Sequence, residues 1–125
     1  MKVLALLLVL LPTLSSAGEK ECLAAIMASE ASGESLEGLV AVAQASINRA
    51  KATRRAVCNI KGVTRKSPPA DLAEYYMALA ESILKGGKSI VGAADSWERS
   101  RVPKYAGKIT RRIEHHTFYV SKRLN

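Results

Sequence analysis

The chain contains few of the residues that bind metals or stack on nucleotide bases. It has two cysteines and two histidines in 125 residues, and no Cys-x-x-Cys spacing. A structural zinc site usually needs four such ligands, so we expect no metal and no cofactor. No aromatic residue is interleaved with the basic pairs Arg54-Arg55, Arg65-Lys66 and Arg111-Arg112. We therefore expect these pairs to be solvated surface.

The chain also lacks an apolar run as long as a transmembrane helix. The run from Val3 to Leu14 spans only about 12 residues, too few to cross a bilayer comfortably. Lys2 precedes it and Ser15-Ser16-Ala17 follows, a pattern typical of a secretory signal peptide. We expect cleavage after Ala17 and export to the periplasm or the cell exterior, with no stable membrane span afterwards. An uncleaved anchor and a buried core helix are the alternatives.

Acidic residues are scarce, since 11 Asp and Glu oppose 19 Lys and Arg and the net charge is +8. Removing residues 1–17 takes away Lys2 and leaves one domain, residues 18–125, with a charge of +7. Such a protein is attracted to anionic polymers. Nucleic acid is scarce outside the cytoplasm, so we expect no nucleic-acid partner. Cell-wall polymers that carry peptide carboxylates fit an exported protein better.

The two cysteines predict one disulfide. Cys22 and Cys58 can pair in only one way within the chain, and an even cysteine count in an exported protein favours that pairing. The bond would close a loop of about 36 residues and contribute roughly 3–4 kcal/mol in the chain-entropy model. Two free buried thiols are the alternative.

Periodicity predicts a mainly α-helical domain with minimal β-structure. Three helices are expected, at about Glu21–Ala31, Leu36–Lys51 and from a Ser67 cap to about Lys85. Ser35 is the expected cap of the second helix. Residues 57–60 are expected to be a short apolar plug and 86–114 mostly loop, with 117–120 as a short strand or a buried anchor.

One carboxylate interrupts an apolar helical face. Leu23, Ile26, Met27 and Glu30 are spaced i, i+3, i+4 and i+7 and share one face, and Gly33 is a plausible stop just beyond them. Glu30 either lies at the edge of that face and reaches solvent or lies in a partly dry cleft. In a cleft, burial disfavours the charged form, and a protonated carboxyl can donate a proton to a glycosidic oxygen.

Hydrolysis of a sugar chain usually needs a second carboxylate. Glu34 lies near the start of the second helix, where a structural role is the better interpretation. Asp95 is the other candidate, although an exposed turn aspartate would look the same. A lytic transglycosylase needs only one carboxyl group, because the 6-hydroxyl of the sugar replaces water as the nucleophile. A chain with a single well-placed Glu30 suits that reaction.

The segment "IMASEASGESLEGLVAVAQASINRAK", residues 26–51, resembles the signature of the spore-cortex-lytic, SleB-like cell-wall hydrolases. Glu30, Gly33-Glu34, Glu37-Gly38 and Asn48-Arg49 match its spaced positions. The C-terminal "ITRRIEHHTFYV" is similar to the family's Ile-Gly-Asn-His-x-Phe-Tyr, with Glu and His in place of Gly and Asn. The resemblance is good over residues 22–51, moderate over 92–120 and weak between.

The resemblance implies a monomeric, lysozyme-like single domain that cleaves the MurNAc–GlcNAc β-1,4 bond of peptidoglycan. It carries the catalytic acid/base over to Glu30. Supporting roles are expected for six further residues: Glu34, Asn48, Asp95, Trp97, His116 and Tyr119. Several of these have simpler alternatives, since Asn48 can be solvent-exposed, Trp97 can be a core or cleft-wall aromatic and His116 a structural histidine.

Three rival functions remain. The first is a hydrolytic muramidase of the same fold. The second is a non-catalytic protein that binds the cell wall with a degenerate form of the fold, whereas the predicted enzyme itself would suit a phage endolysin or a small bacterial wall-remodelling enzyme. The third is a basic exported protein that binds nucleic acid or lipopolysaccharide, for which charge is the only support.

Overall fold

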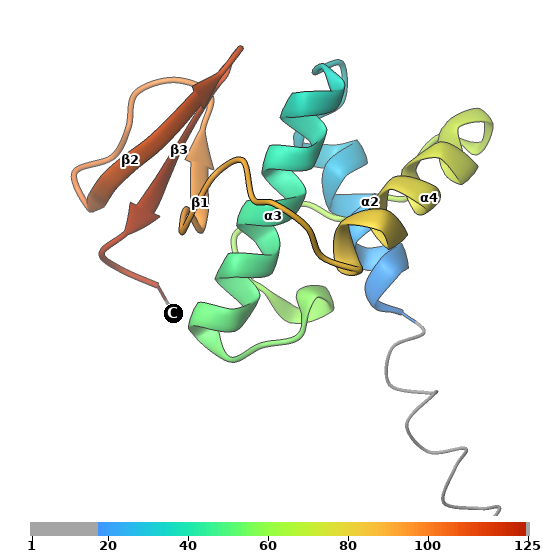
Figure 1. Ribbon diagram of the computed structural model, residues 1–125, viewed down its shortest axis with the longest axis horizontal. Coiled ribbons are helices and arrows are strands. Elements are labelled where there is room, and N and C mark those ends of the chain that lie inside the picture. Colours follow the sequence, from blue (N-terminus) through green and yellow to red (C-terminus); the bar gives the residue numbers. More distant parts are fainter. Residues whose placement is uncertain (1–17, 125) are drawn as a thin grey trace, which may run out of the picture.

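The computed structural model describes residues 18–124 (Figure 1), so the expected signal peptide at residues 1–17 lies outside them. The helical elements are α2 (Glu19–Glu30), α3 (Leu36–Thr53) and α4 (Ala73–Leu84), with short 3₁₀ turns η1 (Val57–Asn59) and η2 (Ala70–Leu72). The strands are β1 (Ser96–Glu98), β2 (Ala106–Ile113) and β3 (His116–Ser121).

Helix α3 occupies the middle of the molecule, with the sheet on one side and helices α2 and α4 on the other (Figure 1). Helix α2 packs against α3 and α4, and α3 packs against β1. The domain is therefore α+β, with three α-helices and one small antiparallel sheet. No helix among residues 18–124 is both long and apolar enough to cross a membrane.

Helix α2 has the apolar face that its spacing predicts. Leu23, Ile26 and Met27 are each 0% exposed and lie in the core. The helix begins at Glu19, two residues before the predicted start, and ends at Glu30. Gly33 follows with φ +84°, in the left-handed region that glycine adopts most readily. The chain turns there and leaves the carboxylate of Glu30 at the C-terminal end of α2.

Helix α3 begins at the predicted residue, Leu36. The Ser35 hydroxyl accepts a hydrogen bond from the Gly38 N–H at 3.3 Å, which confirms the predicted cap. Leu36, the first residue of the helix, is apolar but 56% exposed. The buried face is made largely of small residues instead, and Ala41 and Ala45 are 0% exposed. These small side chains let α3 lie close to its neighbours on both sides.

Helix α4 begins later than predicted. It starts at Ala73 after the η2 turn, and Ser67 does not cap it. Two prolines follow Ser67, and Pro69 is extended with ψ 145°. A residue before proline is disfavoured in the α conformation, so the helix cannot start until the chain has passed both prolines.

The sheet is the main departure from the prediction. Its order is β1-β3-β2, with both pairs antiparallel, so residues 86–114 contain two strands where we predicted mostly loop. Strand β3 is central, and Phe118 and Tyr119 in it are 0% and 2% exposed, which confirms the predicted strand. The β2 strand lies at an edge, is largely exposed and has register shifts around Ile109. Such a strand carries no regular apolar alternation.

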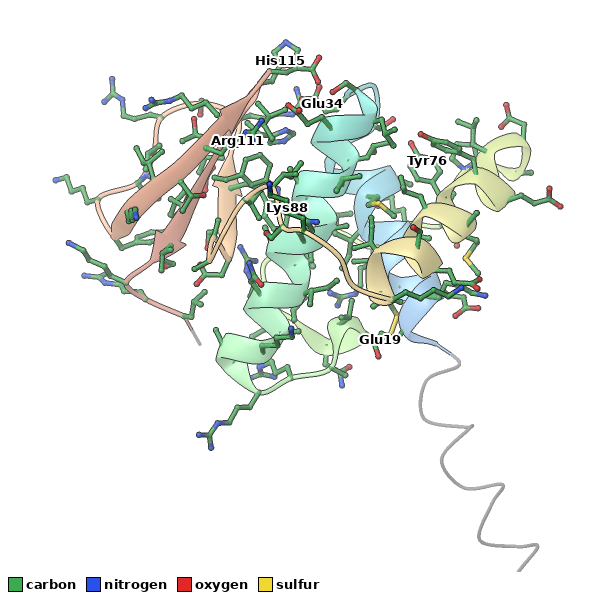
Figure 2. The ribbon with its side chains drawn as sticks, viewed as in Figure 1. Glu19, Glu34, Tyr76, Lys88, Arg111 and His115 are labelled. Atoms are coloured by element: carbon green, nitrogen blue, oxygen red, sulfur yellow. A yellow bond between two sulfur atoms is a disulfide. The ribbon has the colours of Figure 1, made fainter. Side chains whose placement is uncertain are left out.

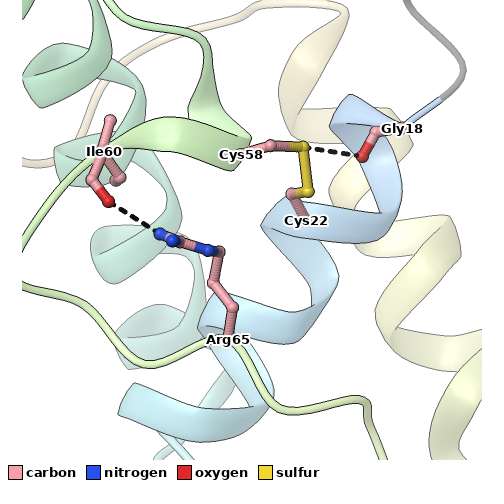
Figure 3. Close-up of a disulfide and its surroundings, with 5 residues drawn as sticks. All are labelled: Gly18, Cys22, Cys58, Ile60 and Arg65. Carbon is pink, nitrogen blue, oxygen red and sulfur yellow. Dashed lines mark hydrogen bonds between the residues drawn. A yellow bond between two sulfur atoms is a disulfide. The ribbon is translucent and has the colours of Figure 1, made fainter.

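Cys22 and Cys58 form the predicted disulfide, which joins α2 to η1 across a sequence separation of 36 residues (Figure 3). The Cys58 sulfur also lies 3.3 Å from the carbonyl oxygen of Gly18. Nearby, the Arg65 guanidinium donates a hydrogen bond to the Ile60 carbonyl at 2.8 Å. The disulfide thus anchors the segment that follows α3 to helix α2. Disulfides persist in oxidising compartments.

Candidate functional site

Glu30 lies at the end of α2 and both of its carboxylate oxygens accept hydrogen bonds. The Thr64 N–H donates to Oε2 at 2.7 Å, and the Trp97 indole N–H donates to Oε1 at 3.3 Å. The side chain is half-buried. A carboxylate oxygen has two lone-pair positions, so each oxygen retains one for a further partner. Glu30 is therefore held in one orientation and can still contact a ligand.

Glu30 forms part of the wall of a pocket of about 460 Å³. The pocket lies between the C-terminal half of α3, the strand β1, the C-terminal end of β3 and the segment after η1. Its lining is predominantly polar and carries charges of both signs. It includes Glu30, Arg49, Thr53, Lys61, Gly62, Ser96, Trp97, Glu98, Tyr105, Tyr119, Ser121, Arg123 and Leu124.

Trp97 is the aromatic wall of this pocket. It is 8% exposed, and the guanidinium of Arg49 lies 5.0 Å from its ring centroid. A cation over an indole face is attracted by the ring quadrupole, so Arg49 holds the ring in place. Trp97 is thus a cleft-wall residue that contacts Glu30 directly.

Tyr119 also lines the pocket and is 2% exposed. Burial raises the pKa of its phenol well above the ordinary value, and the neighbouring Glu98 carboxylate raises it further by a smaller amount. The phenol therefore stays protonated over the physiological pH range. It can serve the pocket as a neutral hydrogen-bonding group.

Asn48 and Arg49 brace α3 against the segment that leads into β1. The Asn48 amide donates to the carbonyls of Gly92 and Ala94 at 3.0 and 2.7 Å. Arg49 donates to the Asp95 carbonyl at 2.8 Å, and burial lowers its pKa while the Asp95 carboxylate opposes that shift. Asn48 and Arg49 therefore mainly position β1 and Trp97.

Asp95 is buried, at 5% exposure, and is not an exposed turn residue. Its Oδ1 accepts hydrogen bonds from the Ser96 hydroxyl and the Ser121 N–H, both at 2.9 Å. Among the described residues it does not belong to the pocket lining. Asp95 therefore connects the start of β1 to the end of β3, while the second carboxylate that the pocket contains is Glu98.

Glu34 lies away from the pocket lining, beneath the turn between β2 and β3. Figure 2 shows Glu34 and His115 close together at that end of the hairpin. The Glu34 side chain is 3% exposed, and its Oε2 lies 3.0 Å from His115 Nδ1. Its Oε1 lies 3.2 Å from Nδ1 of the buried His116, and Arg99 is 3.9 Å from Oε2. Glu34 thus ties the α2–α3 turn to the sheet.

Gly38 makes room for this arrangement. A Cβ at that position would lie 2.9 Å from the Glu34 Cβ, closer than side chains tolerate. The presence of glycine at position 38 of the sequence motif therefore has a steric explanation, because any larger residue there would displace the Glu34 side chain.

The charges of this cluster are strongly coupled. Burial tends to raise the pKa of Glu34, but the hydrogen bond from His115 and the charges of His115, His116 and Arg99 outweigh it, and the net pKa is lowered. Burial also lowers the pKa of His116, against the attraction of Glu34. His116 Nδ1 and Glu34 Oε1 are buried and have no well-aligned hydrogen-bond partner among the described residues. His116 is therefore predominantly neutral near pH 7, beside an ionised Glu34.

These shifts predict that the protein loses stability on acidification in two stages. A histidine with a lowered folded pKa stabilises the fold above its unfolded pKa, about 6.5, and that contribution declines as the pH falls below it. The lowered pKa of Glu34 adds a second decline below about pH 4.5. Urea unfolding between pH 8 and 2 should show a slope of up to about 1.4 kcal/mol per pH unit for each group.

The His116→Gln variant is the matched control for the first stage, because it removes the titrating ring and keeps a polar side chain. Its free energy of unfolding should decline less steeply between pH 7 and 5 than that of the wild type. Identical slopes in the two proteins would show that His116 does not drive the first stage.

Of the thirteen lining residues only Glu30, Trp97 and Tyr119 were predicted as site residues, and the charged or aromatic residues among those missed include Lys61, Glu98, Tyr105 and Arg123. Glu98 directly follows Trp97, a predicted site residue, and this adjacency was the sequence signal that could have identified Glu98 as a pocket residue. Lys61 and Arg123 lie in basic stretches that resemble ordinary surface. Tyr105 is 38% exposed and lies at the pocket.

No cluster of three or more His, Cys, Asp or Glu residues with metal-binding geometry occurs among residues 18–124. Comparison with protein-family models, with curated proteins and with solved structures gives no match.

Proposed function

We propose that this protein is an exported lytic transglycosylase with a lysozyme-like fold, which cleaves the MurNAc–GlcNAc β-1,4 bond of peptidoglycan. The observation that carries the proposal is the position of Glu30. Its carboxylate lies in the wall of a 460 Å³ polar pocket, held by Thr64 and by the indole of Trp97. The reaction requires one oriented carboxyl group within reach of the glycosidic oxygen, and Glu30 supplies an oriented carboxylate in the pocket wall.

In the proposed reaction Glu30 acts first as an acid and then as a base. Its proton passes to the glycosidic oxygen as the bond from that oxygen to C1 of MurNAc breaks. The 6-hydroxyl of the same MurNAc then bonds to C1, and its proton returns to Glu30. The product has a 1,6-anhydro ring, no water is consumed and the carboxyl group is regenerated. Trp97 orients the Glu30 carboxylate through its indole N–H.

A backbone conformation supports the resemblance on which the proposal also depends. Glu114 has φ +49°, in the left-handed region where residues other than glycine are strained. The resembled family commonly has glycine at this position of its C-terminal motif. Here the Glu114 carboxylate accepts a hydrogen bond from the Ser35 N–H at 2.9 Å, which lowers the pKa of Glu114. That contact offers a reason why a glutamate can stand in the place of glycine.

Digestion of purified peptidoglycan by the mature protein tests the proposal. Mass analysis of the soluble fragments should find 1,6-anhydromuramoyl ends, which are one water lighter than reducing ends. A wild-type protein that binds the wall but releases no fragments would refute catalysis and favour the non-catalytic wall-binding alternative.

The hydrolytic muramidase is a second candidate, and the presence of Glu98 in the same pocket favours it. A muramidase needs a second carboxylate to activate water or to act as the nucleophile. If Glu98 has that role, the products have reducing ends and Glu98→Gln lowers the rate by at least about 100-fold. If the proposed transglycosylase is correct, the products are anhydro forms and Glu98→Gln changes the rate far less.

A further inference from the structure

Two cations of the pocket form no ion pair with any residue that the structure describes. Lys61 and Arg123 both line the pocket of Glu30, both are exposed, and neither forms an ion pair within residues 18–124. The third cation differs from them. Arg49 donates to the Asp95 and Lys61 carbonyls at 2.8 and 2.9 Å and lies against Trp97, so its guanidinium is already engaged.

The backbones that carry the two free cations are held in place. The Lys61 carbonyl accepts the hydrogen bond from Arg49. On the other segment, Ser121 Oγ accepts a hydrogen bond from the Arg123 N–H at 3.1 Å, and the Ser121 N–H donates to buried Asp95 at 2.9 Å. The two side chains therefore extend from anchored segments at the edge of the same pocket, where they can reach a ligand.

We propose that Lys61 and Arg123 bind the free carboxylates of the peptides carried by the glycan strand, and so make peptide-bearing strands the preferred substrate. This inference rests on the proposed function. The hydroxyl and acetamido groups of the sugars are neutral, so the anionic groups of a peptide-substituted strand are its peptide carboxylates. The guanidinium of Arg123 can bind a carboxylate through two parallel hydrogen bonds, and the ammonium of Lys61 attracts a carboxylate as a point charge.

A direct test uses the fluorescence of Trp97, which is the only tryptophan of the chain. The probes are a GlcNAc–MurNAc disaccharide that carries a tetrapeptide with free carboxylates, and the same compound with those carboxylates converted to carboxamides. We expect the acidic probe to bind about fivefold to tenfold more tightly at low salt, since two exposed ion pairs are each modest. Raising the salt to 0.5 M should remove most of that difference.

The double variant Lys61→Gln/Arg123→Gln should bind both probes equally. Lys108→Gln and Arg101→Gln are the matched controls, since both residues are exposed cations outside the pocket lining, and these variants should keep the preference. Equal binding of the two probes by the wild type, or an undiminished preference in the double variant, overturns the inference. A wild type that prefers the acidic probe but digests no peptidoglycan would instead refute the proposed function and leave the carboxylate site standing.

Discussion

Glu30→Gln should lower the release of soluble fragments from peptidoglycan by about 10²- to 10⁴-fold, the usual contribution of a positioned acid/base group. The amide has nearly the same shape as the carboxyl group but can neither give up nor accept the proton. In the proposed reaction one group performs both transfers, so no other residue of that mechanism can substitute for it. The measurement is the initial rate of release of muropeptides from purified sacculi.

The same variant should remain folded, although slightly less stable. The two Glu30 oxygens accept hydrogen bonds from two N–H donors, and an amide can accept at only one of these places. Loss of one such bond costs about 1 kcal/mol, which lowers the midpoint of thermal unfolding by roughly 5 °C. Circular dichroism and thermal unfolding measure this.

Glu74→Gln is the control variant, because it makes the same chemical change at an exposed position in α4. It should retain wild-type activity. If folded Glu30→Gln protein releases fragments as fast as the Glu74→Gln protein, Glu30 has no catalytic role and the enzymatic proposal fails.

Removal of the disulfide should have the largest effect on stability. The Cys22→Ala/Cys58→Ala variant frees a closed loop of 36 residues in the unfolded chain. The chain-entropy model then predicts a loss of about 4 kcal/mol in the free energy of unfolding. This is a large fraction of the 5–15 kcal/mol that is typical of a small domain. Urea unfolding followed by Trp97 fluorescence measures it.

The effect should extend to the site. The segment that follows Cys58 provides the Thr64 N–H that orients Glu30, so loosening this segment weakens the hold on the carboxylate. We therefore expect activity to fall in the double-alanine variant even below its unfolding temperature. A loss of less than about 1 kcal/mol would show that packing of η1 against α2, and not the bond, holds this region.

The helices were largely predictable because their signals are local. The i, i+3, i+4 spacing in α2 identified Leu23, Ile26 and Met27 as core residues, and Ser35 was recognisable as a cap. The start of helix α4 differs from the prediction because the two prolines after Ser67 keep the chain extended, and this restriction outweighs the preference of Ser67 for a cap position.

The strands were less predictable for a different reason. Strand β3 is central and buried, so its apolar residues formed a visible run. Strands β1 and β2 lie at the edges, one only three residues long and the other basic and exposed. An edge strand gains its pairing from its neighbour, and its own residues need show little apolar alternation.

By itself, the sequence determined that a carboxylate ends an apolar helix, that a turn follows it and that two cysteines are available to pair. These features depend on neighbours a few residues apart. Only the tertiary structure decided what Glu30 meets: Trp97, 67 residues away, orients it, and Glu98 and not Asp95 shares its pocket. It likewise gave Glu34 its partner His115, 81 residues away. Such pairs form when the sheet packs against α3, and the spacing of residues along the chain does not predict that contact.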